Sequence, residues 1–258
     1  MKINRCFLFL ALNAILFING CSSVYMSVKG KVLTSLEMST ILTELRIQED
    51  VVNSLYSTGS IIVKDWKSEK EANSLIVGER DPFRLKIEIT HSWGRPLLHI
   101  LMNEDIIEIL SFDEGKLYRG HNKSEILSHF LSGIDPQLIW TVARGYPLAW
   151  EHHKAISSGR NRMTLLDNEG KGIEMIYLDP YTLQPDFISF PTSKTNVKFL
   201  SLAEEEGIYY AREVVAETDR ETLILKNSKI FFNKSIPDEI FSIKRPPMFE
   251  IVDLDHQK

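Results

Sequence analysis

The apolar residues of this chain recur with two different periods, and the change between them predicts where helix gives way to strand. Between Thr34 and Tyr56 they recur at close to 3.6 residues, which predicts an amphipathic helix. No clean capping box is evident at Ser35, so the start of this helix stays open. The Ser-Thr-Gly segment at 57–59 predicts its end, because glycine commonly follows the last helical turn.

From Ser60 onward the period falls to two, which is the period of a half-buried strand. In the segment 83–89, apolar residues alternate with Arg84, Lys86 and Glu88, so one face of this strand is apolar. The same alternation predicts an antiparallel meander with turns at 91–96 and 113–115 and a solvated hairpin turn at 204–207. Strands are predicted over residues 60–66, 72–79, 83–89, 97–102, 106–112, 116–119, 163–166, 173–178, 187–190, 197–202, 209–216 and 222–232, with one more near residue 155.

Two helical segments interrupt the meander. Residues 124–131 and 136–144 show helical spacing, and Ser124 is suited to be the N-cap of the first. Both segments are markedly apolar, so we expect them to lie against another apolar surface. Their apolar residues are Ile126, Leu127, Phe130, Leu131, Leu138, Ile139, Trp140 and Val142.

The first 21 residues look like an export signal. Lys2 and Arg5 precede an apolar run over residues 6–18, which is too short to span a bilayer, since about 20 apolar residues are needed. The run ends in Ile-Asn-Gly-Cys, which resembles the bacterial lipobox and predicts cleavage before Cys21 and lipidation of that cysteine. An ordinary signal peptide, or a short buried helix with an incidental cysteine, is the alternative.

The cysteine count supports lipidation. The chain has two cysteines, and removal of residues 1–20 would leave Cys21 alone, so acylation accounts for an otherwise unexplained thiol in an exported protein. The predicted organisation is a signal peptide over 1–20, a lipidated tether over 21–34, one domain over 35–250 and a tail over 251–258. Such a protein is held on a membrane by its acyl chains.

The net charge of the chain argues against two classes of binding partner. Without Lys2 and Arg5, 28 basic residues face 35 acidic ones, a net charge of about −7. An acidic surface argues against nucleic acid and against a polybasic grip on anionic lipid, so the membrane contact is expected through the N-terminal lipid anchor. We expect a monomer.

Motifs for catalysis, metals or cofactors are not evident. None of the seven histidines has the spacing of a metalloprotease motif, and the adjacent pair at 152–153 would point to opposite faces of a strand. The sequence contains no Gly-x-Ser-x-Gly elbow, phosphate-binding loop or dinucleotide fingerprint. We therefore expect no catalytic residues, no metal and no cofactor.

Three segments carry a resemblance to a known family. They are Asp81–Glu88, with its proline, basic residue and alternating aliphatics; Phe112–Gly120, which leads into the apolar helices; and the closing segment Asn233–Phe241. In this order the chain resembles the LolA/LolB superfamily of lipoprotein carriers and receptors over roughly residues 35 to 250. The resemblance implies a mostly β (α+β) fold: a curved antiparallel incomplete β-barrel enclosing an apolar cavity, with an N-terminal helix and an inserted helical lid.

The resemblance also implies a site, because family members hold acyl chains in that cavity. Period-two strands place an apolar side chain on the concave face at every second residue. The predicted cavity residues are Leu85, Ile87, Ile89, Leu98, Ile100, Ile107 and Ile109, and the predicted lid residues are Ile126, Leu127, Phe130 and Leu131. The alternative is that these side chains fill a dry core, which periodicity cannot distinguish from a cavity lining.

A turn supplies one further candidate. Family receptors carry a protruding apolar residue on a loop in this region, and Trp93, followed by Leu97, would take that role of delivering cargo to the membrane. A tryptophan in a turn favours the membrane interface. The alternative is that Trp93 folds back as a plug at the sheet end.

Together these features predict a non-enzymatic lipoprotein on the periplasmic side of the outer membrane. It would bind acyl chains and receive or insert lipoproteins or other lipids, and a periplasmic carrier protein is a further candidate partner. Ser22 after the lipidated cysteine is not the aspartate that retains lipoproteins in the inner membrane of enteric bacteria. Two alternatives remain: an envelope sensing or scaffold lipoprotein of the same fold, and a hydrolase whose catalytic cluster would lie at one end of the cavity.

Overall fold

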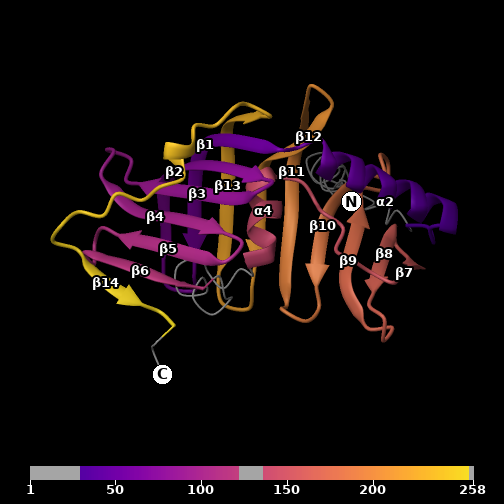
Figure 1. The fold of residues 1–258 in the computed structure, drawn as a ribbon. Helices are drawn as coiled ribbons and strands as arrows, with labels where there is room; N and C mark the ends of the chain where they lie inside the picture. The colour runs from indigo at the N-terminus through magenta and orange to yellow at the C-terminus, as the bar shows by residue number, and fades with distance from the viewer. Residues whose placement is uncertain (1–29, 122–135, 256–258) are drawn as a thin grey trace, which may run out of the picture.

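The computed structural model describes residues 30–121 and 136–255. The predicted signal peptide, Cys21 and the predicted lid residues Ile126, Leu127, Phe130 and Leu131 lie outside these ranges. The described elements, shown in Figure 1, are α2 (Ser35–Asp50), β1 (Ser54–Lys64), β2 (Glu69–Arg80), β3 (Phe83–Thr90), β4 (Pro96–Asn103), β5 (Ile106–Ser111), β6 (Lys116–His121), α4 (Pro136–Arg144), β7 (Lys154–Gly159), β8 (Arg162–Leu166), β9 (Gly172–Leu178), β10 (Pro185–Phe190), β11 (Thr195–Glu205), β12 (Ile208–Glu217), β13 (Thr222–Phe232), the 3-10 turn η1 (Asp238–Ile240) and β14 (Glu250–Asp253).

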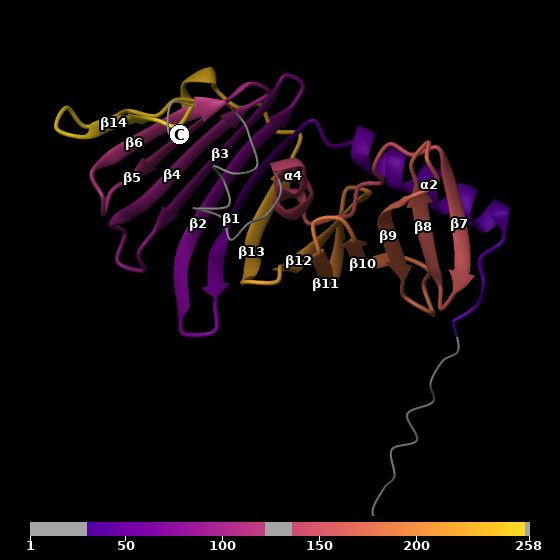
Figure 2. The same ribbon diagram turned by 90° about the horizontal axis from the view of Figure 1, so that it is seen from below.

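All of these strands join one sheet. Its order is β14-β6-β5-β4-β3-β2-β1-β13-β12-β11-β10-β9-β8-β7. Strands that follow one another in sequence pair antiparallel from β1 to β6 and from β7 to β13. Strand β1 also pairs antiparallel with β13, β14 pairs parallel with β6, and β14 and β7 lie at opposite ends without pairing to each other. The sheet is strongly curved, with α4 inside the curve and α2 across the half that ends in β7 (Figure 2). The predicted mostly β fold, a curved and unclosed antiparallel barrel with an N-terminal helix, is confirmed.

Helix α2 ends earlier than predicted. It runs from Ser35 to Asp50, and its start has the capping box that the sequence did not suggest: the Thr34 side chain accepts from the Glu37 backbone N–H, and the Glu37 carboxylate accepts from Thr34. The predicted extension to Tyr56 is wrong, because β1 begins at Ser54. Leu55 is buried and Tyr56 is partly exposed, an alternation that suits a strand as well as a helix terminus.

Gly59 does not end a helix; it bends the sheet. It lies inside β1 at a bulge, where the register with β13 shifts between Thr58 and Gly59 and skips Ser228. A Cβ at position 59 would lie 1.7 Å from the backbone oxygen of Lys226, so only glycine permits this approach. Bulges increase local twist, and the strands on the two sides of this point run almost crosswise in Figure 1.

The concave face is packed around α4. Gly78 of β2 provides the space, since a Cβ there would lie 2.8 Å from the Trp140 ring. The Phe83 ring meets Trp140 edge-on, with 6.2 Å between ring centroids. The remaining space between Val142 and Ala143 of α4 and the sheet is about 30 Å³, roughly that of a water molecule.

Both helices meet at the bend through buried polar groups. The Gln48 side chain donates to the Gly207 carbonyl at 2.8 Å and accepts from the Tyr209 backbone N–H at 2.9 Å. Arg144, fully buried at the end of α4, donates through Nη2 to the Gln48 carbonyl. Burial lowers the pKa of Arg144 to about 10, which leaves it protonated at neutral pH. The other two guanidinium nitrogens of Arg144, Nε and Nη1, have no hydrogen-bond partner among the described residues.

The last described segment adds a strand. The residues predicted as a tail, 251–258, begin inside β14, which pairs parallel with β6. The Leu254 backbone N–H donates to the Arg119 carbonyl at 2.9 Å, and the Asp255 carboxylate lies 2.6 Å from Nδ1 of His121. This strand covers an edge that would otherwise expose unpaired backbone groups.

One carboxyl is buried in the apolar interior. Glu174 of β9 shares its face with Ile176 and Leu178, and its Oε2 accepts from the Trp150 backbone N–H at 2.9 Å. Its Oε1 has no partner among the described residues. Burial raises the pKa of Glu174 to about 8. The carboxyl is therefore neutral in the folded protein at pH 6, where it is ionised in the unfolded chain.

Replacement of Gln48 tests the junction. Gln48→Leu leaves the Gly207 carbonyl and the Tyr209 N–H without their partner, so we expect a loss of about 1–3 kcal/mol of unfolding free energy. Urea denaturation measures it. Arg46→Leu, at an exposed position of the same helix, is the control and should change the midpoint little. An equal effect of both variants would show that the Gln48 hydrogen bonds contribute nothing specific.

Glu174 predicts a pH dependence of stability. A carboxyl with a raised folded-state pKa contributes full stability below its unfolded pKa of about 4.3, and that contribution falls as pH rises toward 8. Glu174→Gln keeps an acceptor for Trp150 and removes the ionisation, so its melting temperature should exceed the wild-type value by more degrees at pH 8 than at pH 5. Thermal unfolding at the two pH values measures this, with exposed Glu169→Gln as control. A difference that does not change with pH would contradict the assignment.

Candidate functional site

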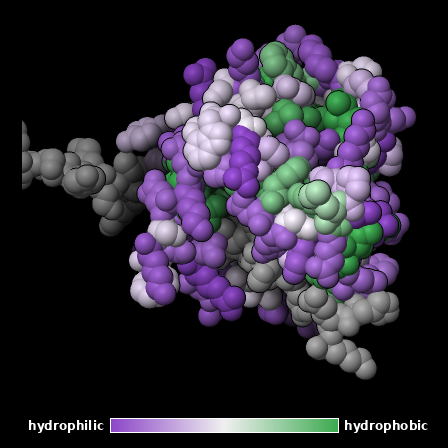
Figure 3. Space-filling view, turned by 90° about the vertical axis from the view of Figure 1, so that its left-hand side faces the viewer, coloured by the Kyte–Doolittle hydropathy of each residue, from purple (hydrophilic) through white to green (hydrophobic). Residues whose placement is uncertain are grey.

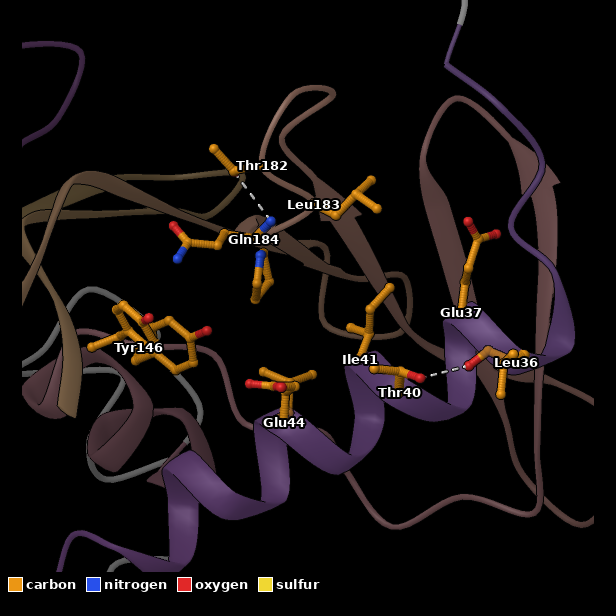
Figure 4. Close-up of a pocket in the computed structure, with 12 residues that line it drawn as sticks. Leu36, Glu37, Thr40, Ile41, Glu44, Tyr146, Thr182, Leu183 and Gln184 are labelled. Atoms are coloured by element: carbon orange, nitrogen blue, oxygen red, sulfur yellow. Dashed lines mark hydrogen bonds between the residues drawn. The ribbon is translucent and has the colours of Figure 1, made fainter. Parts of the chain in front are cut away.

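A cavity of about 460 Å³ lies between α2 and the turn that joins β9 to β10 (Figure 4). Small-molecule sites commonly have volumes of about 300–1,000 Å³. Apolar and aromatic side chains form most of its wall. The lining residues are Leu36, Glu37, Thr40, Ile41, Glu44, Leu45, Tyr146, Thr182, Leu183, Gln184, Pro185 and Tyr209.

One wall is helix α2, which is anchored at both ends and spans the cavity in between. At its start, the Leu33 backbone N–H donates to the Ser157 hydroxyl at 3.0 Å. At its end, Gln48 binds the β11–β12 hairpin. Ile41 and Leu45 turn toward the sheet and are buried, so the helix contributes aliphatic surface to the cavity.

The opposite wall is a rigid turn. One carboxylate oxygen of Asp179 accepts from the backbone N–H groups of Tyr181 and Thr182 at 2.9 and 2.8 Å, and these hydrogen bonds lower the pKa of Asp179. Leu183 has a φ of 58°, a left-handed conformation that is uncommon for leucine. The turn thus holds Leu183 and Gln184 at the cavity (Figure 4).

Two tyrosines form the inner end. Gly145, with a φ of 74°, ends α4 and turns the chain so that Tyr146 stacks on Tyr209, with 6.1 Å between ring centroids and 25° between ring planes. Burial raises the pKa of Tyr146 to about 12, so the phenol is neutral. The inner end therefore offers aromatic faces and hydroxyl groups but no charge.

The charged side chains of the lining are both acidic. Glu37 forms an ion pair with Lys31, and hydrogen bonds from Lys31 and Thr34 lower its pKa to about 2. No described residue forms an ion pair with Glu44, whose carboxylate turns toward Tyr146 in Figure 4. Among the described residues that line the cavity there is no Lys, Arg or His.

The predicted cavity residues lie elsewhere, together on the concave face of β3, β4 and β5. Cross-strand partners such as Ile87 and Ile100, or Ile100 and Ile109, place them on one face. Leu98 is partly buried and the others are buried: Leu85, Ile87, Ile89, Ile100, Ile107 and Ile109. The sequence grouped these side chains, but the 460 Å³ cavity is lined by different residues. An acyl chain among them stays a prediction.

Trp93 projects into solvent. It lies in the turn between β3 and β4, its side chain is 72% exposed, and its ring stacks on His91 with 4.2 Å between centroids. It does not plug the sheet end. Leu97 is partly buried and packs against the core.

Trp66 was not predicted as a site residue. The sequence pattern placed it in a strand, but β1 ends at Lys64 and Trp66 is 85% exposed in the next turn, with Lys67 Nζ 4.2 Å from its ring centroid. The β1–β2 and β3–β4 turns lie at the same edge of the sheet, because β2 and β3 reverse direction between them (Figure 2). In the sequence, the feature that could have identified Trp66 as exposed is its position between the charged residues Asp65 and Lys67.

The end of the sheet that is formed by β14 lies far from the cavity, which is in the half that ends in β7. On the side that carries β14, hydrophilic side chains predominate and apolar ones gather in separate patches (Figure 3). No helix within residues 30–121 and 136–255 is long and apolar enough to cross a membrane. Nor do His, Cys, Asp and Glu in these ranges form a group of three that could hold a metal ion.

The cavity was not visible in the sequence because its lining comes from four separate parts of the chain: 36–45, 146, 182–185 and 209. Apolar residues in α2 signal only that the helix packs against something. The left-handed Leu183 also has no sequence signature, since glycine or asparagine is the usual residue in that conformation.

No family model matches the chain, and comparison with curated protein sequences gives no match. Solved structures do match. A domain described as an outer membrane lipoprotein-sorting protein domain, from Vibrio parahaemolyticus, has a TM-score of 0.53 at 10% identity over 79% of this chain and 96% of that one. A DUF1329 family protein from Desulfovibrio piger has a TM-score of 0.53 at 11% identity, over 79% and 96%. A LolA superfamily protein from Nitrosomonas europaea has a TM-score of 0.50 at 14% identity, over 80% and 97%. This chain has the LolA/LolB-like fold.

Proposed function

We propose that this protein is a lipid-anchored, non-enzymatic lipoprotein that holds acyl chains in the cavity between α2 and the β9–β10 turn. It receives or inserts lipoproteins or other lipids on the periplasmic side of the outer membrane. The observation that carries the proposal is a 460 Å³ cavity with mostly apolar walls in a LolA/LolB-like fold. The neighbours described as lipoprotein-sorting or LolA superfamily proteins support it.

The cavity suits a chain better than a compact polar ligand. Leu36, Ile41, Leu45, Leu183 and Pro185 provide aliphatic walls. Each CH₂ moved from water to such a surface gains about 0.8 kcal/mol. Among the described residues, the space between Val142 and Ala143 of α4 and the sheet is about 30 Å³, so a chain entering at that point would first have to displace α4. The cavity beside α2 needs no such displacement.

Trp93 and Trp66 suit a membrane contact. Both are strongly exposed at one sheet edge, on turns two strand positions apart, which is about 10 Å. An exposed indole gains by entering the headgroup region, where its ring is buried and its N–H stays hydrated. The acyl anchor at Cys21 would supply stable attachment, and these side chains would orient the domain on the bilayer.

Native mass spectrometry of the mature chain from residue 21 onward with Cys21→Ala, hereafter the Cys21→Ala protein, tests the acyl site when the protein is purified under mild conditions and its lipids are then extracted. We expect co-purifying acyl lipid or uptake of an added acylated peptide. Leu183→Asn should reduce that uptake, because asparagine tolerates the left-handed backbone while it places an amide at the apolar wall. Tyr181→Asn, in the same turn but outside the lining, is the matched control.

A Cys21→Ala protein that carries no lipid and takes up no acylated peptide would overturn the proposal. If a partner protein were then recovered by cross-linking without cargo transfer, the sensing or scaffold alternative would account for the fold. Uptake that Leu183→Asn leaves unchanged would place the chain elsewhere, with the concave face beneath α4 as the next candidate.

The two exposed tryptophans predict vesicle binding. The Cys21→Ala protein should bind phosphatidylethanolamine–phosphatidylglycerol vesicles weakly, with a blue shift of tryptophan emission. Trp93→Ser and Trp66→Ser should each weaken binding several-fold, and the double variant more than either, because each indole contributes its own burial. Tyr181→Ser, an exposed aromatic in the other half of the sheet, is the control for nonspecific loss. Unchanged binding by the double variant would remove both residues from the membrane contact.

A further inference from the structure

We propose that Glu44 makes the cavity selective for chains whose polar end is cationic or donates N–H groups, and that it rejects chains ending in a carboxylate or phosphate. An acylated amino terminus belongs to the accepted class, and a free fatty acid belongs to the rejected one. This inference rests on the proposed acyl site, and it names the ligand class for that site.

The position of Glu44 is the first argument. It lies one helical turn before Gln48 and borders the cavity with Ile41 and Leu45, the residues that form the aliphatic wall. Its carboxylate turns into the space toward Tyr146 (Figure 4). The proximity of that negative charge also contributes to the raised pKa of Tyr146. A chain lying along the wall would bring its polar end close to this carboxylate.

The absence of a competing cation in the lining is the second argument. Glu37 already has Lys31 as its ion-pair partner. Arg144 lies behind Tyr146, with its guanidinium carbon 5.1 Å from the ring centroid, and it is fully buried and bound to the Gln48 carbonyl. Among the described residues of the lining, Glu44 therefore carries the charge, without an ion-pair partner, that a ligand would meet.

The surroundings of Glu44 set how strongly its charge acts. Glu44 is an exposed residue, so solvent screens it on one side, while the apolar walls lower the effective dielectric constant on the side that faces the cavity. Tyr146, Thr182 and Gln184 add hydroxyl and amide groups that can hydrogen-bond a neutral polar end. An anionic end would lose hydration and face Glu44 without compensation, whereas an ammonium or amide N–H would gain a hydrogen-bonding partner.

Three ligands with one chain length separate the contributions. Dodecylammonium and dodecanoate, each below its micelle concentration at pH 7, and dodecanol below its solubility limit, would compete with the neutral fluorescent probe N-phenyl-1-naphthylamine for the Cys21→Ala protein. We expect dodecylammonium to bind about tenfold more tightly than dodecanoate, with dodecanol between them. Glu44→Gln should remove most of that preference, and Glu44→Lys should reverse it.

The controls distinguish this inference from the proposed function. Glu71→Gln, which removes an exposed carboxylate on β2 in the other half of the sheet, should keep the wild-type preference. If none of the three ligands displaces the probe, the acyl site itself fails. If all three displace it equally, or if Glu44→Gln keeps the preference, the chain binds but Glu44 does not select its polar end, and the inference is overturned.

Discussion

At the bend of the sheet, the carbonyl of Gln48 near the end of α2 accepts a hydrogen bond from Arg144 at the end of α4. The carboxyl end of a helix carries partial negative charge, so the guanidinium lies where two such ends meet. The Gln48 side chain meanwhile binds the β11–β12 hairpin through Gly207 and Tyr209. These three hydrogen bonds therefore fix both helices against the same part of the sheet.

The cavity follows from this way of fixing α2. Gln48 holds one end of the helix on the hairpin, and the hydrogen bonds of Lys31 and Leu33 with Asn161 and Ser157 hold the other end on β7 and the β7–β8 turn. Between these points the helix faces the β9–β10 turn, whose shape is set by its own hydrogen bonds to Asp179. Two rigid segments that are each held from elsewhere need not close on each other, and the space between them remains open.

The fold could be predicted from sequence because its evidence is periodic. Alternation over 83–89 and the helical spacing over 136–144 survive in the structure as β3 and α4. The misassignments occurred where two periods give the same pattern, as at Leu55 and Tyr56, or where a glycine has more than one use. Gly59 looked like a helix terminus because that role is local, while its real role depends on Lys226, far along the chain. The 460 Å³ cavity likewise depends on residues that are far apart in the sequence, since four separate segments meet there.

The positions of the membrane contact and the cavity constrain any transfer of cargo. Trp66 and Trp93 lie in the β1–β6 half of the sheet, whereas the cavity lies beside α2 in the half that ends in β7 (Figure 2). Residues 30–33 run beside the β7–β8 turn and lead directly into the helix that forms the cavity wall. In the proposed function, the lipid anchor precedes residues 30–33 in the chain, while the tryptophans contact the bilayer at the other half of the sheet. Two separate attachments restrict the orientation of a curved sheet on a surface more than one does, and the anchor would tether the half of the sheet that carries the cavity.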